Sequence, residues 1–372
     1  MPLRVVFDGR TLSSPAGGVR RYTHELFDAM HLVAPDVEVT AIGAEPLAIL
    51  PAGVRRAAAG ASLPTNLGWS LTGLPLGVRR VAADLFHAPA YTAPLWGVHP
   101  LVVTIHDVSY ARHPEWYPYR IDPVRQAFYR ASARRADRIL TDSKFSRDEI
   151  VAAFDIDPGR IDVVPLGVST RFTPDPAVTR ELFVLHVGDL HPRRNLSMLL
   201  ETVLELRRSQ PACRGLRLVL AGADRGLLKS LTAQAAAAPD ALAYAGTPSD
   251  DELIGLYRRA AVFAYPSRYE GFGLPPLEAM ACAAPVVAST AGSVPEVVGD
   301  AAVLLDVDDT HGWRDAIQRL FTDAAHAAEL SARGPVQASR FTWAQTARLT
   351  IACYRRAVAR PGSAQGPTER WR

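Results

Sequence analysis

The sequence of 372 residues contains little that could cross-link a fold or anchor it in a membrane. Its three cysteines lie far apart and form no Cys-x-x-Cys spacing, so they indicate neither a disulfide framework nor a zinc site. No apolar run approaches the roughly 18 residues of a membrane-spanning helix, and the first residues lack a signal-peptide pattern. We therefore expect a cytoplasmic protein, with the inner face of the plasma membrane as an alternative location.

Lysine is scarce, because Lys144 and Lys229 are the only two. A net charge of +3 is too small to indicate a nucleic-acid-binding surface, so we expect no nucleic-acid partner. One helix has a basic stripe next to aromatic residues, which allows weak peripheral membrane association, although a solvated helix face is the favoured interpretation. The stripe consists of Arg130, Arg134, Arg135 and Arg138, and its aromatic neighbours are Trp116, Tyr117 and Tyr119.

Familiar phosphate-binding and metal-binding motifs are also missing. The first strand, turn and helix contain neither a Gly-x-Gly-x-x-Gly fingerprint with a downstream acid nor a Walker loop. No convincing loop contains the Asp-x-Asp element of metal-dependent transferases. Any bound phosphate must be held in another way, and we expect no tightly bound cofactor and no obligatory metal.

Short apolar runs alternate with helical patterns along most of the chain. In the first half we expect strands at 3–7, 37–42, 85–87, 101–105, 138–141 and 161–164, and helices at 19–31, 123–136 and 145–154. In the second half we expect strands at 182–187, 216–221, 243–245, 262–265 and 285–288, and helices at 196–209, 226–238, 250–260 and after Pro275. The alternation predicts an α/β fold with two Rossmann-like, doubly wound domains and a cleft between them.

Domain boundaries follow from the point at which the alternation restarts, near a Pro-rich segment at 173–176. We place an N-terminal acceptor domain at 1–170 and a C-terminal donor domain at 171–340. A helix at 341–359 and a flexible, polar tail at 360–372 complete the chain.

The most informative segment runs from Tyr265 to Ala281, where two carboxylates flank a junction between a loop and a helix. Pro275 suits the first turn of that helix, whose unpaired amides can face a diphosphate. Glu270 and Glu278 offer acceptors to paired sugar hydroxyls. Taken singly, Glu278 could only complement the helix dipole and Glu270 could be a solvated loop acid. Their combination predicts a nucleotide-sugar site.

Two other segments place polar groups where a strand ends. Arg193 and Arg194 follow the strand at 182–187 and precede a helix, so they suit a diphosphate, although they could instead be solvated beside a capping Asn195. His106 and Asp107 follow the strand at 101–105, at the sheet edge that should face a ligand. A histidine at such a place is more often a hydrogen-bonded structural residue.

These segments together resemble glycosyltransferase family 4, a retaining family in which two glutamates are separated by seven residues in a Glu-Gly-Phe-Gly-Leu-Pro context. The resemblance extends from Gly17-Gly18 to Phe341-Thr-Trp-Ala. The surroundings of His106 and the segment 113–118 resemble its bacterial polysaccharide mannosyltransferase branch. The resemblance implies the GT-B architecture, in which two Rossmann-like domains face a central cleft and the last helix crosses back to the N-terminal domain.

The resemblance also implies roles for individual residues. Catalytic roles would fall to Glu270 on the transferred sugar, to Arg194 on the diphosphate in place of the family's lysine, and to His106 as a transition-state contact. Glu278 would bind the ribose. The other donor-binding candidates are Gly271, Phe272, Gly273, Leu274, Gly17, Gly18, Arg193 and Asp250. Weaker acceptor-side candidates are Arg20, Tyr22 and Asp107, followed by Asp8 and His24.

The expected activity is retaining transfer of a hexose, mannose from GDP-mannose, to a hydroxyl of a saccharide acceptor by front-face displacement. The slight preference for GDP rests on Asp250, whose carboxylate could accept both N–H donors of a guanine edge, although helix capping is the favoured interpretation of this residue. Alternatives are a glucosyl- or N-acetylglucosaminyltransferase that uses a UDP-sugar, and a GT-B sugar-nucleotide epimerase. The oligomeric state is left open.

Ala283 departs from the family pattern, which usually has a glycine after the signature helix. If this position needs a positive φ, the methyl group would cost about 1 kcal/mol.

Overall fold

The computed structural model describes residues 2–43, 45, 47–61, 65–117 and 122–359. The chain divides into two compact units. The first contains the residues up to Gly167 together with those from Thr342 onward, and the second runs from Val168 to Phe341. The tail expected at 360–372, and Tyr119 of the aromatic set, lie outside the described residues.

The first unit is built on a parallel sheet of seven strands in the order β3-β2-β1-β4-β5-β6-β7. In chain order the strands are β1 (Leu3–Asp8), β2 (Val37–Ile42), β3 (Arg55–Ala57), β4 (Leu85–Ala88), β5 (Leu101–Thr104), β6 (Arg138–Thr141) and β7 (Ile161–Val163). The helices are α1 (Gly17–Val33), α2 (Asn66–Gly68), α3 (Leu74–Val78), α4 (Ser109–Arg112), α5 (Pro123–Arg135), α6 (Lys144–Phe154) and α14 (Trp343–Val358).

The second unit repeats the plan with a parallel sheet of six strands in the order β10-β9-β8-β11-β12-β13. The strands are β8 (Glu181–Val187), β9 (Arg217–Ala221), β10 (Leu242–Tyr244), β11 (Ala260–Tyr265), β12 (Val286–Ser289) and β13 (Val303–Leu305). The helices are α7 (Leu196–Ser209), α8 (Leu228–Gln234), α9 (Asp250–Arg259), α10 (Leu274–Ala281), α11 (Val294–Val298), α12 (Thr310–Thr322) and α13 (Ala324–Ala338). The prediction of two parallel-sheet α/β domains is confirmed.

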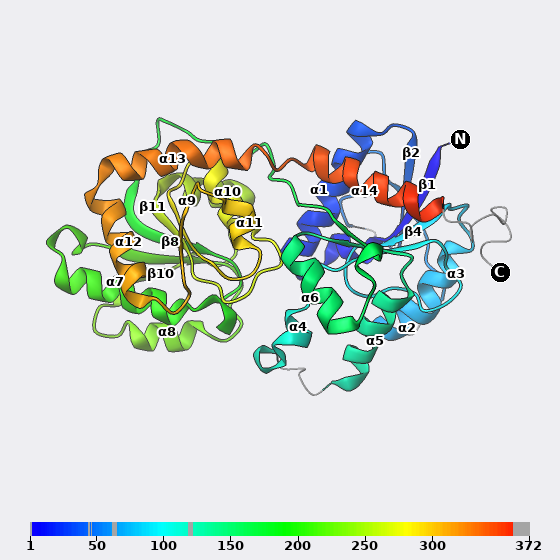
Figure 1. The fold of residues 1–372 in the computed structure, drawn as a ribbon, viewed down its shortest axis with the longest axis horizontal. Helices are drawn as coiled ribbons and strands as arrows, with labels where there is room; N and C mark the ends of the chain where they lie inside the picture. Colours follow the sequence, from blue (N-terminus) through cyan, green and yellow to red (C-terminus); the bar gives the residue numbers. More distant parts are fainter. Residues whose placement is uncertain (1, 44, 46, 62–64, 118–121, 360–372) are drawn as a thin grey trace. The chain divides into compact units, whose positions relative to one another are not determined.

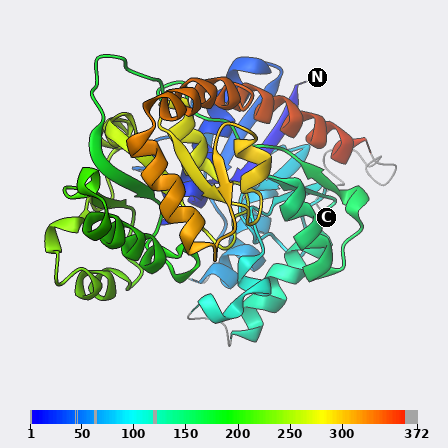
Figure 2. The same ribbon diagram turned by 60° about the vertical axis from the view of Figure 1, so that its left-hand side comes forward.

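Central strands are apolar because helices cover both faces of each sheet. β4, β5 and β12 are buried along their whole length, and each unit has its own large apolar core. In the second unit α12 packs on β11, β12 and β13, while α13 packs on α10. Both α12 and α13 are orange in Figures 1 and 2. Each unit is therefore stabilised by its own hydrophobic core.

The last helix, α14, belongs to the first unit. It packs along α1 and touches β4, β5 and β6, as Figure 1 shows for α1 and α14. Tyr354 of α14 is fully buried, and its hydroxyl lies 2.7 Å from Nδ1 of His87 on β4. The helix that ends the described chain is thus tied into the interior of the N-terminal sheet.

Both strand orders reverse beside the first strand of the sheet: between β1 and β4 in the first unit, and between β8 and β11 in the second. In open parallel sheets, ligands bind beyond the carboxyl ends of the strands at such a switch point. The second switch point is followed by the loops that carry Arg194, after β8, and Glu270, after β11.

Candidate functional site

The loop after β11 is held in shape by its own backbone and by a neighbouring segment. Gly273 precedes α10 with φ 109°, in the left-handed region that favours glycine. A Cβ atom at Gly292 would lie 2.6 Å from the carbonyl oxygen of Glu270, so only glycine fits there. Next to it, the Ser293 hydroxyl lies 3.0 Å from the Glu270 carbonyl and 2.8 Å from the Phe272 carbonyl. Ser293 was not among the site residues predicted from the sequence.

Glu270 and Arg194 form a buried ion pair at the switch point of the second sheet. Their exposed fractions are 5% and 7%, and Nη1 of Arg194 donates to Oε1 of Glu270. The same Nη1 donates to the Tyr265 hydroxyl and, over 2.9 Å, to the Ser267 hydroxyl. Ser267 in turn donates to Glu270 over 2.7 Å. Charge-assisted contacts of this kind fix both side chains against the end of β11.

One face of the Arg194 guanidinium lies under a glycine. Gly188, with φ 140°, follows the strand β8, and a Cβ atom there would lie 3.3 Å from Cζ of Arg194. Nε of Arg194 is buried and has no hydrogen-bond partner among the described residues. A buried, charged donor without a partner is costly, so this N–H is suited to an anionic ligand.

Glu278, the second acid of the segment, lies on α10 and is 4% exposed. Its Oε2 accepts a hydrogen bond of 3.0 Å from the hydroxyl of Tyr257, a fully buried residue of α9. Tyr257 packs edge-on against Phe172, with ring centroids 6.0 Å apart. The orientation of Glu278 is therefore set by a neighbouring helix.

Asp250 lies in the first turn of α9, where a capping box joins Ser249 and Glu252. Its Oδ2 lies 3.3 Å from Nη1 of Arg171, whose Nη2 lies 2.6 Å from Asp251. The Asp250 carboxylate, which was expected to accept hydrogen bonds from a guanine edge, is thus paired with the Arg171 guanidinium at the start of α9. This geometry fits the capping interpretation and weakens the case for GDP.

Arg193 is partly buried in the short turn that precedes Arg194. Its carbonyl accepts a hydrogen bond of 2.8 Å from the amide of Arg268, in the loop after β11. The two loops at the switch point are therefore joined through their backbones.

In the first unit, His106 follows β5 and pairs with Asp142, which follows β6. Nδ1 of His106 lies 2.8 Å from Oδ2 of Asp142, and the two side chains are 13% and 4% exposed. Burial alone would lower the pKa of His106, but the charge and hydrogen bond of Asp142 outweigh it and raise that pKa. Burial in turn raises the pKa of Asp142. The sequence analysis did not single out Asp142, although its place at a strand end was a usable signal.

Tyr22, expected on the acceptor side, lies in the core instead. It is 2% exposed, and its hydroxyl lies 2.9 Å from Oγ1 of Thr104. Thr104 also lies 2.8 Å from Nε2 of His87. Burial lowers the pKa of His87 to about 3, so this imidazole is neutral, and nearby His106 adds to the effect. The inward face of α1 explains the correction, because it turns Tyr22 toward the sheet.

Gly17 and Gly18 form the first turn of α1 rather than a loop before it. Ala16 precedes them without a side-chain cap, and no atom lies within 4 Å of a Cβ atom built on either glycine. The first amides of a helix have no intrahelical partner. The helix start is therefore open to a close ligand approach.

The other acceptor-side candidates make local contacts. Arg20 donates over 3.1 Å to the Ser14 carbonyl, and Oδ1 of Asp107 accepts from the amide of Ser109 at the start of α4. Asp8, at the end of β1, accepts from Arg10 and from the Trp69 indole, 3.1 Å away. His24 pairs with Asp28 one turn along α1.

Three arginines of the basic stripe have hydrogen-bond or ion-pair partners. Arg134 donates to the Phe154 carbonyl over 3.1 Å, and Arg135 donates to the Val98 carbonyl over 3.4 Å. Arg138 pairs with Asp162 at 2.7 Å. A carbonyl partner does not neutralise a guanidinium, so weak membrane association stays a prediction. Within the described ranges, no helix is long and apolar enough to cross a bilayer.

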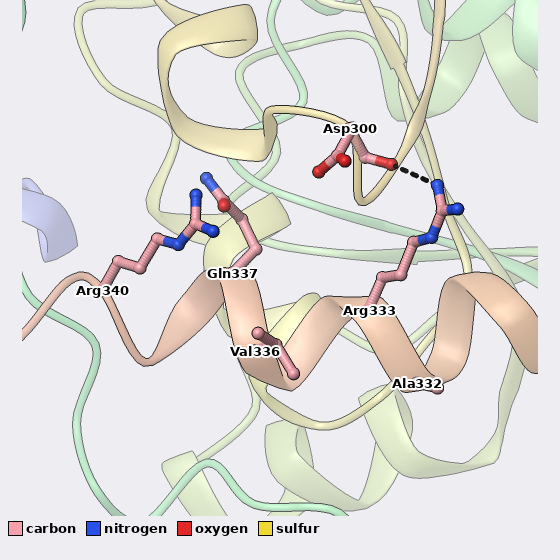
Figure 3. A pocket seen from close by; sticks show the side chains of 6 residues that line it. All are labelled: Asp300, Ala332, Arg333, Val336, Gln337 and Arg340. Carbon is pink, nitrogen blue, oxygen red and sulfur yellow. Dashed lines mark hydrogen bonds between the residues drawn. The ribbon is translucent and has the colours of Figure 1, made fainter.

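A hollow of about 330 Å³ opens on α13 and is lined by Asp300, Ala332, Arg333, Val336, Gln337 and Arg340 (Figure 3). Arg333 reaches across it to the Asp300 carbonyl, 3.4 Å away. None of the candidate residues lines this hollow. The part of the chain that the structure describes contains no group of three or more His, Cys, Asp or Glu that could hold a metal ion.

Comparison with known proteins identifies relatives for both units. Residues 16–172 match the family described as Glycosyltransferase Family 4, and residues 181–323 match Glycosyl transferases group 1. O-antigen chain mannosyltransferase B of Escherichia coli is 30% identical over 95% of this chain and 100% of its own length. MMP alpha-(1->4)-mannosyltransferase of Mycolicibacterium hassiacum is 32% identical over 70% of this chain and 66% of its own length.

Solved structures show the same fold. Alr3699/HepE of Anabaena, in complex with UDP and glucose, superimposes with a TM-score of 0.71 at 19% identity, covering 95% of this chain and 98% of the other. The two parallel-sheet α/β domains of this chain thus belong to the GT-B architecture.

Proposed function

Because this chain belongs to glycosyltransferase family 4, we propose that it transfers mannose from GDP-mannose to a hydroxyl of a saccharide acceptor, with retention of configuration. That it is a glycosyltransferase follows from the family. The finer proposal of mannose is supported by two relatives that are named mannosyltransferases. A mannan-type oligo- or polysaccharide is the acceptor class that the first of these names favours.

The observation that carries the proposal is the buried pair of Arg194 and Glu270 at the switch point of the second sheet. A guanidinium with an unpartnered Nε suits a diphosphate, and a fixed carboxylate suits sugar hydroxyls. The start of α10 follows the same loop and adds the Leu274 amide, because Pro275 and Pro276 have no N–H and the Leu277 amide donates to the Gly273 carbonyl. All three elements that a nucleotide-sugar donor needs therefore meet at one sheet edge.

Individual roles follow from this geometry. Arg194 and Arg193 neutralise the diphosphate, while Glu270 accepts hydrogen bonds from hydroxyls of the transferred sugar. Glu278, oriented by Tyr257, accepts hydrogen bonds from the ribose diol. The backbone from Gly271 to Leu274 lies beside the sugar and its phosphate. In the first unit, Gly17, Gly18 and His106 are the groups that we propose to donate hydrogen bonds to a substrate.

The chemical step is a front-face displacement. The bond between C1 and the phosphate oxygen breaks, the acceptor oxygen bonds C1 from the same face, and the leaving phosphate takes the hydroxyl proton. Glu270 is a poor nucleophile because Arg194 and Ser267 already bind its Oε1. Donated hydrogen bonds that strengthen as charge develops on the phosphate lower the barrier. This chemistry uses no obligatory metal, so full activity should persist in excess chelator.

A UDP-hexose-dependent transferase is the second candidate, and one observation favours it. The pairing of Asp250 with Arg171 weakens the reason to prefer guanine over uracil. A sugar-nucleotide epimerase is separated from both transferases by product analysis without an acceptor, because only the epimerase converts the donor alone.

A thermal-shift panel with GDP-mannose, UDP-glucose and UDP-N-acetylglucosamine tests the donor. A ligand present at 100 times its Kd should stabilise the native protein by about 2.7 kcal/mol. We expect GDP-mannose to raise Tm and the Glu278→Gln variant to lose most of that shift, while the matched Glu329→Gln variant keeps it. Glu329 is a half-exposed acid of α13 that pairs with Arg333. A shift with UDP donors alone would exclude GDP-mannose and leave the second candidate.

A further inference from the structure

We propose that Asp142 is a positioning residue for glycosyl transfer, which holds His106 with its Nδ1–H toward the carboxylate and thereby presents Nε2 to an oxygen of a bound substrate. The inference rests on the proposed function for the identity of what Nε2 meets. The pairing itself is a property of this chain and can be tested without any substrate.

The backbones on either side of the pair are locked together. β5 and β6 are neighbouring parallel strands, and the amide of Ile105 donates to the Leu140 carbonyl over 2.9 Å. The Thr141 hydroxyl donates to the Ile105 carbonyl over 2.8 Å, and the Ser146 hydroxyl donates to the His106 carbonyl over 3.0 Å. The two residues that follow these strands are therefore fixed before their side chains meet.

Aromatic rings fix the orientation of the imidazole. Tyr22 lies edge-on to it, with ring centroids 4.6 Å apart and planes at 83°. Tyr91 packs against it as well, at 6.0 Å and 73°. Tyr91 has φ 51°, a conformation that a bulky residue rarely adopts, and its amide donates to the Thr104 carbonyl over 2.9 Å. The two tyrosine rings and the hydrogen-bonded backbone of Tyr91 thus fix the position of the His106 imidazole.

Comparison with two fully buried histidines, His87 and His186, shows what is particular to His106. Both nitrogens of His87 have partners, in Thr104 and Tyr354. His186 of β8 has an unpartnered Nε2, but its Nδ1 meets only the Ala264 carbonyl, 3.0 Å away. His106 combines an unpartnered, buried Nε2 with a carboxylate on Nδ1. An unpartnered Nε2 alone therefore does not distinguish His106 from His186. The carboxylate of Asp142 on Nδ1 does.

The charges around His106 determine its protonation. Asp142 faces it from the end of β6 and Asp107 adjoins it, while His87 of β4 and the phenols of Tyr22 and Tyr91 are the other titratable groups against the ring. Burial lowers the pKa of His106, but both aspartates and the Pro89 carbonyl raise it, and the net direction is upward. Below that pKa the ring is charged and Nε2 is a hydrogen-bond donor. Removing the Asp142 charge should lower the pKa, so the donor is lost at a lower pH.

The first experiment is ¹⁵N NMR of the imidazoles in the full chain, with the His106 signals assigned from a His106→Asn variant. We expect a titration above the ordinary histidine pKa, a proton on Nδ1 in the neutral ring, and a lower pKa in Asp142→Asn. Identical titrations in wild type and Asp142→Asn, or a neutral ring protonated on Nε2, would overturn the proposal. This result does not depend on the donor or the acceptor.

The second experiment follows GDP release from GDP-mannose across pH, with methyl α-mannoside and with water as acceptor probes. We expect Asp142→Asn to lower kcat/KM by about 10- to 100-fold and to move the alkaline limb to lower pH. In a His106→Asn background the same substitution should lower kcat/KM by less than about twofold, because the effects of two residues that act through one another are not additive. Equal losses in both backgrounds, with an unchanged pH profile, would assign Asp142 a merely structural role.

A matched control uses Asp162, a carboxylate on β7 of the same sheet that pairs with Arg138 and Arg356. Asp162→Asn should keep the wild-type pH profile and the wild-type His106 titration. Thermal unfolding and circular dichroism of every variant establish that it folds. If wild type turns over none of the nucleotide sugars, the proposed function fails, and the NMR titration alone decides the role of Asp142.

Discussion

The two sheets share one strand order around their switch points but hold their charged side chains in opposite ways. At the carboxyl edge of the second sheet, Glu270 and Arg194 are partners of each other, so the charges balance before any ligand binds. At the edge of the first sheet, Asp142 binds only one side of His106 and leaves Nε2 without a partner. The balanced pair in the second unit suits tight binding with little rearrangement. The pair in the first unit suits a contact that forms with the substrate.

Breaking the charge balance in the second unit should produce the largest effect. Arg194→Met leaves the Glu270 carboxylate buried without its cation, so the free energy of unfolding should fall by about 3–5 kcal/mol. Urea denaturation measures the change.

The control for this prediction removes both charges. An Arg194→Met, Glu270→Gln double variant leaves no unpaired charge and should recover most of the lost stability. If the double variant were as unstable as the single one, packing of the guanidinium rather than the ion pair would explain the loss.

Removing only the Glu270 charge should lower turnover, and it should also destabilise the fold because the Arg194 guanidinium stays buried without its anion. Glu270→Gln keeps the shape and one acceptor oxygen, but it weakens hydrogen bonds to sugar hydroxyls that become more polarised in the transition state. We expect kcat/KM to fall about 100-fold, or about 2.7 kcal/mol. Steady-state kinetics with GDP-mannose measures it, with Glu329→Gln as the control. Unchanged turnover would remove Glu270 from the catalytic set and leave the pair as a structural element.

The contact between Tyr257 and Glu278 should have a smaller effect, confined to donor binding. Tyr257→Phe removes a hydrogen bond to a buried carboxylate, worth about 1.5–3 kcal/mol. Part of that should appear as an increase of roughly tenfold in the Kd for GDP-mannose, measured by calorimetry. Tyr244→Phe, which removes an exposed hydroxyl bound to the Gly222 carbonyl, is the matched control and should bind normally. Equal affinities for the two variants would mean that α10 alone orients Glu278.

The strands and helices with regular apolar spacing were predictable from the sequence, and those at the edges were not. β2 and α7 have the predicted bounds, because Val37–Ile42 alternates and Leu196–Ser209 is strongly amphipathic. β3 escaped prediction because Arg55–Ala57 is a short, polar edge strand. α13 escaped because Gly334 and Pro335 interrupt its pattern inside the helix.

Parts of the candidate site were predictable where its residues are neighbours in sequence. The segment from Glu270 to Glu278 is one loop and one helix, so its sequence identifies it. The pairing of His106 with Asp142 joins residues 36 positions apart and depends on which strands are adjacent. The burial of Tyr22 depends on the rotation of α1 against the sheet. Contacts of these two kinds require the tertiary structure.

The smallest effect concerns how a helix ends in each unit. Ala283 follows α10 with φ 61°, and Asp155 follows α6 with φ 55°. An aspartate adopts the left-handed region with little strain, whereas an alanine there carries a steric cost. Ala283→Gly should therefore raise the free energy of unfolding by about 1 kcal/mol, measured by urea denaturation, and Asp155→Gly should change it by only a few tenths. Equal changes in the free energy of unfolding for the two substitutions would contradict this prediction. They would mean that the lower entropy of the unfolded chain with alanine offsets the strain at Ala283. The departure from the family's usual glycine would then cost this protein nothing.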